Sequence, residues 1–222
     1  MGSSDSVMSR FLPGLLLAAV AIAAWWMFLR GGDHQAVPQP PAGVLATGSS
    51  AAPDLLQPSQ IGAAYVQSAA QTRKTTDAEI RSGQSAAALQ VINASWKAGA
   101  WAGWAQANGS ITALSRAEVF TTGSSLSSVL SGFEKRAIRQ YHGKAVGPPS
   151  AVPGDSGWFV TGTTISQIYS TLYPAKRQVA VYGWQHGDVL AVIVVTGLPK
   201  DDVGEVAATL ARAQDQNIGY VG

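Results

Sequence analysis

The segment Gly154-Asp155-Ser156-Gly157 could present a serine as a nucleophile, which is the most reactive chemistry that any part of this sequence offers. A serine that attacks a carbonyl group needs a histidine to accept its proton and an aspartate to orient that histidine. The chain has three histidines, His34, His142 and His186, and none stands in a sequence context typical of serine proteases. A turn that follows Pro153 explains the segment better, so we expect that the protein is not an enzyme.

Metal and cofactor chemistry has few residues to support it. The chain contains no cysteine, which excludes thiolate nucleophiles, disulfide bonds and cysteine-ligated metals. The segment His186-Gly187-Asp188 offers two ligands, which are too few for a structural metal site, and its residue types are typical of a hairpin turn. We expect no metal and no cofactor.

Large aromatic side chains are the most informative candidates for binding. Trp101, Trp104, Tyr182 and Trp184 stand in segments otherwise rich in alanine, glycine and valine. Such rings can line a pocket that contacts a ligand or partner, and they can equally fill a core. Trp101 and Trp104 point to opposite sides of one predicted strand, so at least one of them should lie off the principal core face.

A group of basic residues is the second candidate for binding: Lys135, Arg136, Arg139 and Lys144. It could contact anionic headgroups or an acidic partner, or it could be only the solvated face of a helix. The formal net charge of the chain is +2, which is too small for a protein that binds nucleic acid. We therefore expect no nucleic-acid partner.

Residues 11–29 form an apolar run without a charged residue, which predicts a single transmembrane helix. At the rise of an α-helix the run is roughly 28 Å long, close to the thickness of the hydrocarbon layer. The segment Ala21-Ile22-Ala23 resembles a signal-peptidase site, and a cleaved secretory signal is the alternative. Trp25 and Trp26 near the end of the run, followed by Arg30, favour an uncut membrane anchor.

The segments that flank this helix predict its orientation. Residues 1–10 should be cytoplasmic, although the flanking basic residues favour this orientation only weakly. Residues 30–53 are rich in Pro, Gly, Ala, Ser and Thr and cannot bury enough apolar surface to fold. They read as a linker that holds residues 54–222 away from the membrane. The predicted location is the plasma membrane, with one span and an extracytoplasmic C-terminal domain.

Two similar units are predicted inside residues 54–222. An apolar segment at residues 54–62 should dock on the domain, and a helix should run over residues 77–96 despite Gly83. Alternating residues on both sides of Asn108-Gly109 then predict a hairpin, which is followed by a helix from about residue 126. The same order recurs with strands at 177–185 and 189–196 and a helix that begins after Asp201 or Asp202.

This pattern predicts an α+β domain with one antiparallel sheet and helices packed on one face. The sequence does not decide between a duplication and two independent solutions to the same packing problem. Either would give two strand-turn-strand-helix units, joined by a Pro/Gly-rich loop at residues 143–157.

Residues 55–62 (Leu-Leu-Gln-Pro-Ser-Gln-Ile-Gly) and the terminal helix with Ala-Arg-Ala-Gln-Asp at 211–215 resemble extracytoplasmic lipoprotein and sensor-type domains of actinobacteria. One of these is the extracellular domain of a mycobacterial serine/threonine kinase. The resemblance implies an α+β domain outside the membrane that binds a ligand or partner in a cleft and lacks catalysis. This chain departs from the family because it has no lipobox cysteine and no disulfide cysteines, and a transmembrane helix would replace the lipid anchor.

Two functions are consistent with these features. The first is a single-pass, non-enzymatic accessory or assembly subunit of a membrane protein complex, whose outer domain docks to a protein partner. The alternative is an extracytoplasmic sensor or carrier domain that binds a lipid or another apolar ligand in an aromatic-lined cleft.

Overall fold

The computed structural model of the chain describes residues 51–107, 109–121, 124–166 and 175–218. The predicted cytoplasmic N-terminus, the transmembrane helix at residues 11–29 and nearly all of the predicted linker lie outside the described residues. Within the described ranges, no helix is long and apolar enough to cross a membrane.

Within the described residues, seven strands form one antiparallel sheet, in the order β1-β2-β3-β7-β6-β5-β4. Two hairpins, β2–β3 and β6–β7, form as the sequence predicts, and they lie side by side at the centre of the sheet. Gly109 and Gly187 have positive φ angles of 67° and 57° in the two turns, a backbone region that glycine enters without strain. The strands are β1 (Tyr65–Lys74), β2 (Trp96–Gln106), β3 (Thr112–Phe120), β4 (Lys144–Ala145), β5 (Ser156–Ser166), β6 (Ala175–His186) and β7 (Val189–Gly197).

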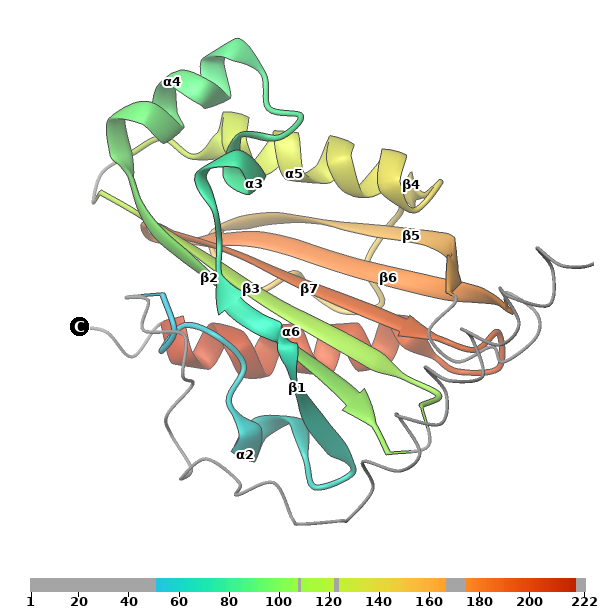
Figure 1. The fold of residues 1–222 in the computed structure, drawn as a ribbon. Helices are drawn as coiled ribbons and strands as arrows, with labels where there is room; N and C mark the ends of the chain where they lie inside the picture. Colours follow the sequence, from blue (N-terminus) through green and yellow to red (C-terminus); the bar gives the residue numbers. More distant parts are fainter. Residues whose placement is uncertain (1–50, 108, 122–123, 167–174, 219–222) are drawn as a thin grey trace, which may run out of the picture. The chain divides into compact units, whose positions relative to one another are not determined.

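Helices cover both faces of the sheet, so the prediction that they pack on one face is wrong. The helices are α2 (Pro58–Ile61), α3 (Asp77–Arg81), α4 (Ala86–Ser95), α5 (Ser127–Gln140) and α6 (Val203–Ile218). Figure 1 shows α3, α4 and α5 on one side of the sheet and α6 on the other. Contacts agree, since α5 packs on β5 and β6 and α6 packs on β6 and β7. We call these two sides the α5 face and the α6 face.

The physical reason lies in the central strands, which are apolar on both sides. In β7, Val189 and Ile193 belong to the core on the α6 face, whereas Leu190 and Val192 belong to the core on the α5 face. Because successive side chains of a strand point to opposite faces, such a strand needs cover on both. The core of the α6 face also holds four buried aromatic side chains of the sheet: Trp104, Phe159, Tyr182 and Trp184.

The opposite placement of α5 and α6 also bears on duplication. β3 and β7 are antiparallel neighbours at the centre of the sheet, so a two-fold axis that exchanged the two hairpins would have to stand perpendicular to the sheet. Such an axis would leave both helices on the same face. The helices lie on opposite faces, so the two strand-turn-strand-helix units are not related by that symmetry.

The single helix predicted over residues 77–96 is broken into α3 and α4. Gly83 adopts a φ of 68° between them, which ends the first helix, and Ser85 then caps the second by accepting a hydrogen bond from the Ala88 N–H. Thr76 and Glu79 form a capping box at the start of α3. The break turns α4 away and leaves α3 as a short element above the sheet (Figure 1).

The segment expected to dock on the domain does so on the α6 face. Leu55 and Leu56 are fully buried, and the Leu56 N–H donates to Ser115 Oγ over 2.9 Å. Asn217 of α6 donates to the Leu55 carbonyl over 2.7 Å. Ala51, which the sequence assigns to the linker, is also fully buried in this core.

Candidate functional site

The residues that could have formed a serine-protease site are kept apart by strand register. Ser156 pairs with Gln185 across β5 and β6, and cross-strand neighbours share a face of the sheet. His186 is the next residue of β6 and therefore points to the opposite face. Its Nδ1 lies 2.9 Å from Asp215 Oδ1, which also accepts the Trp184 Nε1–H over 2.9 Å. The geometry thus joins His186 to a tryptophan through Asp215 and separates it from Ser156.

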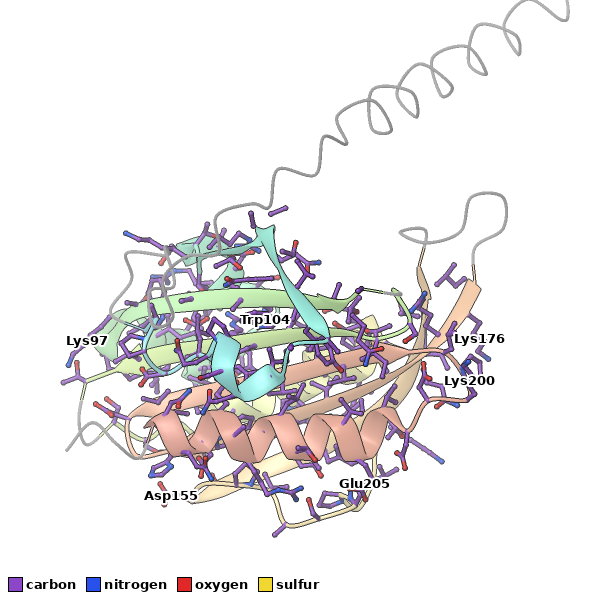
Figure 2. All side chains as sticks on the ribbon, turned by 90° about the horizontal axis from the view of Figure 1, so that it is seen from below. Lys97, Trp104, Asp155, Lys176, Lys200 and Glu205 are labelled. Carbon is purple, nitrogen blue, oxygen red and sulfur yellow. The ribbon has the colours of Figure 1, made fainter. Side chains whose placement is uncertain are left out.

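The aromatic candidates also divide between the two faces. Trp104, Tyr182 and Trp184 are 2%, 0% and 0% exposed and lie together in the core of the α6 face. Figure 2, seen from the α6 side, shows Trp104 in the interior, whereas Lys97 stands at the periphery. Trp101 is half-buried on the α5 face, where it lines a cavity. The expectation that Trp101 and Trp104 point to opposite sides is confirmed.

The basic candidates do not form one patch. Arg136 is half-buried and lines the same cavity as Trp101. Lys135 and Arg139 are exposed on α5, and Lys144 is exposed in β4, where it lines a separate hollow. The structure therefore brings together one residue of each candidate group, Trp101 and Arg136.

The cavity on the α5 face lies between the sheet and the helices α3 and α5. Its volume is about 340 Å³, within the usual range for small-molecule sites. One part of its wall is charged and aromatic, and the other part is apolar. Six of the lining residues define these two parts: Trp101, Leu114, Arg116, Phe133, Arg136 and Val192.

Three arginines and two aromatic rings alternate along the charged part of the wall. The Arg116 guanidinium stands 4.5 Å from the centre of the Trp101 ring and 4.6 Å from that of Phe133. Arg73 lies 5.6 Å from the Trp101 ring, and Arg136 lies 5.5 Å from the Phe133 ring. Each distance falls within the range of a cation–π contact. We call these five residues the arginine–aromatic stack, which links β1, β2 and β3 to α5.

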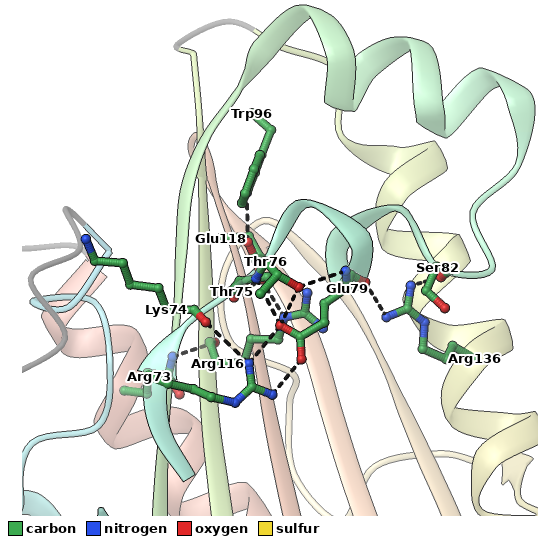
Figure 3. Close-up of polar contacts among 11 residues, drawn as sticks. Arg73, Lys74, Thr75, Thr76, Glu79, Ser82, Trp96, Arg116, Glu118 and Arg136 are labelled. Carbon is green, nitrogen blue, oxygen red and sulfur yellow. Dashed lines mark hydrogen bonds and ion pairs between the residues drawn. The ribbon is translucent and has the colours of Figure 1, made fainter. Parts of the chain in front are cut away.

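Glu118 fixes Arg116, the centre of this stack, through a hydrogen bond (Figure 3). Its Oε1 accepts the Arg116 Nε–H over 2.6 Å and the Thr75 hydroxyl over 2.8 Å, and its Oε2 accepts the Trp96 Nε1–H over 2.8 Å. Burial raises the pKa of Glu118, while Arg116 and the other donors oppose that rise. A Cβ at Gly99 would collide with this carboxylate, so the close approach requires glycine there.

The rim of the cavity is built by α3. Glu79 accepts two hydrogen bonds from Arg73, of 2.7 and 2.5 Å, and these bonds lower the pKa of Glu79 to about 2. Arg136 donates to the carbonyls of Glu79, over 3.0 Å, and of Ser82. Burial, followed by repulsion from Arg116 and Arg139, lowers the pKa of Arg136 to about 10.

Two guanidinium nitrogens of this site have no hydrogen-bond partner among the described residues. They are Nη2 of Arg116, whose residue is 4% exposed, and Nε of Arg136. A buried donor without a partner costs about 1–3 kcal/mol, and more for a charged group. Hydrogen bonds to Glu118 and to the α3 carbonyls thus fix Arg116 and Arg136, while one nitrogen of each arginine keeps no partner among the described residues.

A larger hollow of about 680 Å³ lies at the β4–β5 edge and includes His142, Lys144, Phe159 and Asp202 in its lining. Its charged residues, Lys144 and Asp202, are exposed and therefore already solvated. The smaller cavity is the better candidate because its central arginine, Arg116, is buried, Arg136 is half-buried, and both are orientated by specific partners.

Sequence reasoning missed Arg116 and Glu118. They stand two residues apart in a strand that is otherwise largely apolar, and this spacing places both on one face. A spaced pair of opposite charges in a strand predicted to be central is a readable signal for a buried ion pair. The contacts of Arg116 with the Trp101 and Phe133 rings depend on the packing of β2 and α5 and could not be read from spacing.

Comparisons with known proteins find a distant similarity among solved structures. No protein-family model and no curated protein matches the chain. Among solved structures, the chain is similar to the extracellular domain of PknH from Mycobacterium tuberculosis. The predicted likeness is confirmed. The match has 13% sequence identity and a TM-score of 0.38, and it covers 73% of this chain and 93% of that chain.

Proposed function

We propose that the chain is a membrane-anchored, non-enzymatic sensor or carrier domain that binds a small molecule in the cavity on the α5 face. The observation that carries this proposal is the arginine–aromatic stack. Five side chains from four elements form this stack, with Arg116 at its centre. Three of their nitrogens have no hydrogen-bond partner among the described residues: Trp101 Nε1, Arg116 Nη2 and Arg136 Nε. Most buried polar groups in folded proteins are paired, so unpaired arginine nitrogens beside a cavity are candidates for contact with a ligand.

The proposed location follows from the sequence. The apolar run at residues 11–29 would span the membrane once, and the linker would hold the domain on the extracytoplasmic side. A ligand in that compartment, or one that enters from the outer leaflet, would reach the cavity without crossing the bilayer.

The accessory-subunit hypothesis stays a prediction of the sequence. It requires a protein partner that docks on the outer domain, and the cavity, which has the volume of a small-molecule site, gives no support for such a partner. A measurement of mass distinguishes the two functions, because a protein partner and a small molecule add very different masses.

The test is native mass spectrometry of the full-length protein, released gently from its own membranes. We expect a small-molecule adduct on the wild type that is absent from Trp101→Ala, a variant that removes one ring of the stack. Lys97→Ala, an exposed residue of the same strand, is the matched control and should keep the adduct.

Circular dichroism should show that Trp101→Ala stays folded, because the Trp101 side chain is only half-buried. A wild type without any adduct, or an adduct that survives in folded Trp101→Ala, would contradict the proposed site. Additional protein mass in place of a small adduct would support the accessory subunit.

A further inference from the structure

We infer that the ligand is an amphipathic carboxylate, whose headgroup contacts Arg116 and Arg136 and whose apolar body lies against Leu114, Val192 and Val194. This inference rests on the proposed function and names the chemical class that the same cavity would select. Charge, hydrogen-bond geometry and the composition of the wall each support it.

The contacts of Arg116 leave one direction open for a ligand. The guanidinium contacts the Trp101 and Phe133 rings, whose centres lie 4.5 and 4.6 Å away, and Glu118 accepts the Nε–H. New hydrogen bonds can therefore form only in the plane of the group, along its terminal nitrogens. Nη2 is buried and has no partner among the described residues, and Arg116 lines the cavity. An acceptor on a bound ligand would satisfy this N–H.

Arg136 is also fixed by hydrogen bonds, and its Nε–H is available to a ligand. Its two terminal nitrogens donate to the Glu79 and Ser82 carbonyls, so the side chain is fixed against α3. Its Nε is buried and unpartnered within the described part of the chain. The two arginines thus line one cavity, and each has one buried nitrogen without a partner among the described residues. A carboxylate has two acceptor oxygens, which matches this pair of donors.

The charge balance of the site calls for a single negative charge. Arg73 pairs with Glu79, and Arg116 pairs with Glu118, which leaves the charge of Arg136 uncompensated within the stack and its anchors. Repulsion from Arg116 contributes to the low pKa of Arg136, so an anion bound between their fields would be stabilised by both. A monoanion neutralises the site, whereas a cation would add to the repulsion.

The rest of the wall is apolar and suits a hydrocarbon or aromatic body. Val181, Val192 and Val194 line the cavity from β6 and β7 and are 1%, 8% and 8% exposed, and Leu114 adds a further aliphatic surface from β3. The volume of about 340 Å³ equals the liquid volume of roughly eleven water molecules. A ligand with on the order of ten non-hydrogen atoms would fill it, of which most must be carbon.

The experiment compares three probes that share one body and differ in headgroup: phenylbutanoate, phenylbutanol and phenylbutylammonium. Binding to the full-length protein is measured by ligand-observed NMR titration. We expect the carboxylate to bind at least about tenfold more tightly than the alcohol, the difference that one charge-assisted contact provides. The ammonium probe should bind more weakly than the alcohol.

Two variants on α5 then locate the headgroup. Arg136→Gln should lower the affinity for phenylbutanoate about tenfold and leave that for phenylbutanol unchanged. Arg139→Gln makes the same change of charge one turn away at an exposed residue and should leave both affinities unchanged. If Arg136→Gln does not fold, the headgroup series on the wild type decides alone.

The possible failures are distinguishable. Equal affinities for carboxylate and alcohol would overturn the inference and leave the cavity as a binding site. Equal losses in Arg136→Gln and Arg139→Gln would also overturn it, because they would show general surface attraction. Absence of binding by all three probes would count against the proposed function as well.

Discussion

The two faces of the sheet differ in how completely their buried polar groups are hydrogen-bonded. On the α6 face, Gln214 is fully buried with both amide atoms paired, since it accepts from Ser115 Oγ over 2.9 Å and donates to the Arg116 carbonyl over 3.0 Å. Trp184 also has its partner there, whereas Trp104 Nε1 is an exception. On the α5 face, charged N–H groups of Arg116 and Arg136 stay unpartnered beside a cavity, as far as the described residues extend.

This difference separates stability from binding within one domain. A polar group that is fully paired specifies how a helix sits on the sheet, and it has nothing left to offer a ligand. The polar groups that fix α6 and residues 54–57 on the sheet are paired in this manner, for example Gln214 with Ser115 and Asn217 with the Leu55 carbonyl. The α5 face instead holds its arginines rigidly by rings and a carboxylate and leaves part of their hydrogen-bonding capacity open, as a pre-organised site should.

Trp184→Ala should reduce stability more than any other single change proposed for either face, because it removes a fully buried ring from the α6 face. Loss of such a side chain costs about 3–5 kcal/mol, and the Asp215 carboxylate also loses a donor. Urea unfolding followed by circular dichroism would measure the free energy of unfolding.

Trp101→Ala is the matched control on the α5 face. The half-buried Trp101 contributes mainly its contacts with Arg73 and Arg116, so its loss should cost no more than about 1–2 kcal/mol. Similar losses of stability for the two tryptophans would contradict the division between a structural face and a binding face.

Much of the central fold could be predicted from local patterns. The two hairpins follow from alternation around Asn108-Gly109 and from the apolar run of β7, although Asn108 itself lies outside the described residues. Strand β1 was missed because it is an edge strand whose mostly polar sequence has no period-two apolar pattern, and most of its residues are not buried. Its position depends on pairing with β2, which is a long-range contact.

The covering of both faces and the candidate site were harder to predict for related reasons. Apolar residues on both sides of β7 show that each face needs cover, but they do not say which helix lies where. Trp101 and Arg136 were named as candidates from residue type alone. Arg116 was not, because its contacts with two rings require α5 to lie above β3, and no local pattern encodes that packing.

Asp54→Asn tests the α6 face through pH. Asp54 is 5% exposed in the docking segment, and burial, together with repulsion from Asp188, raises its pKa to about 6. The unfolded chain releases this proton near pH 4, so the native state loses stability as pH rises from about 4 to about 6, and the cost is complete above that. Asp54→Asn should therefore stabilise the protein by about 2 kcal/mol near pH 7.5 and by little near pH 4.

Thermal unfolding of Asp54→Asn at both pH values measures this gain, and Asp155→Asn, which changes an exposed aspartate, is the control. A gain that did not depend on pH would show that the Asp54 carboxylate is not the cause.

Glu79→Gln should show a smaller effect with the opposite dependence on pH, on the α5 face. The pKa of Glu79 is lowered to about 2 by its hydrogen bonds with Arg73 and then by those of Thr76, so its contribution to stability is complete above the ordinary glutamate pKa of about 4.3. It is lost as pH falls through about 2. The Glu79 side chain is 31% exposed, and solvent screening limits the loss to about 1 kcal/mol or less near pH 7. Urea unfolding near pH 7 and near pH 2.5 would detect it, with Glu205→Gln, an exposed glutamate of α6, as the control.

The same variant should also change ligand binding. Because Arg73 would lose the Glu79 carboxylate, the rim of the cavity would gain one uncompensated positive charge. Carboxylate affinity should then rise slightly while stability falls, and a fall in both would mean that Glu79 positions Arg136, whose guanidinium donates to the Glu79 carbonyl, more than it neutralises Arg73.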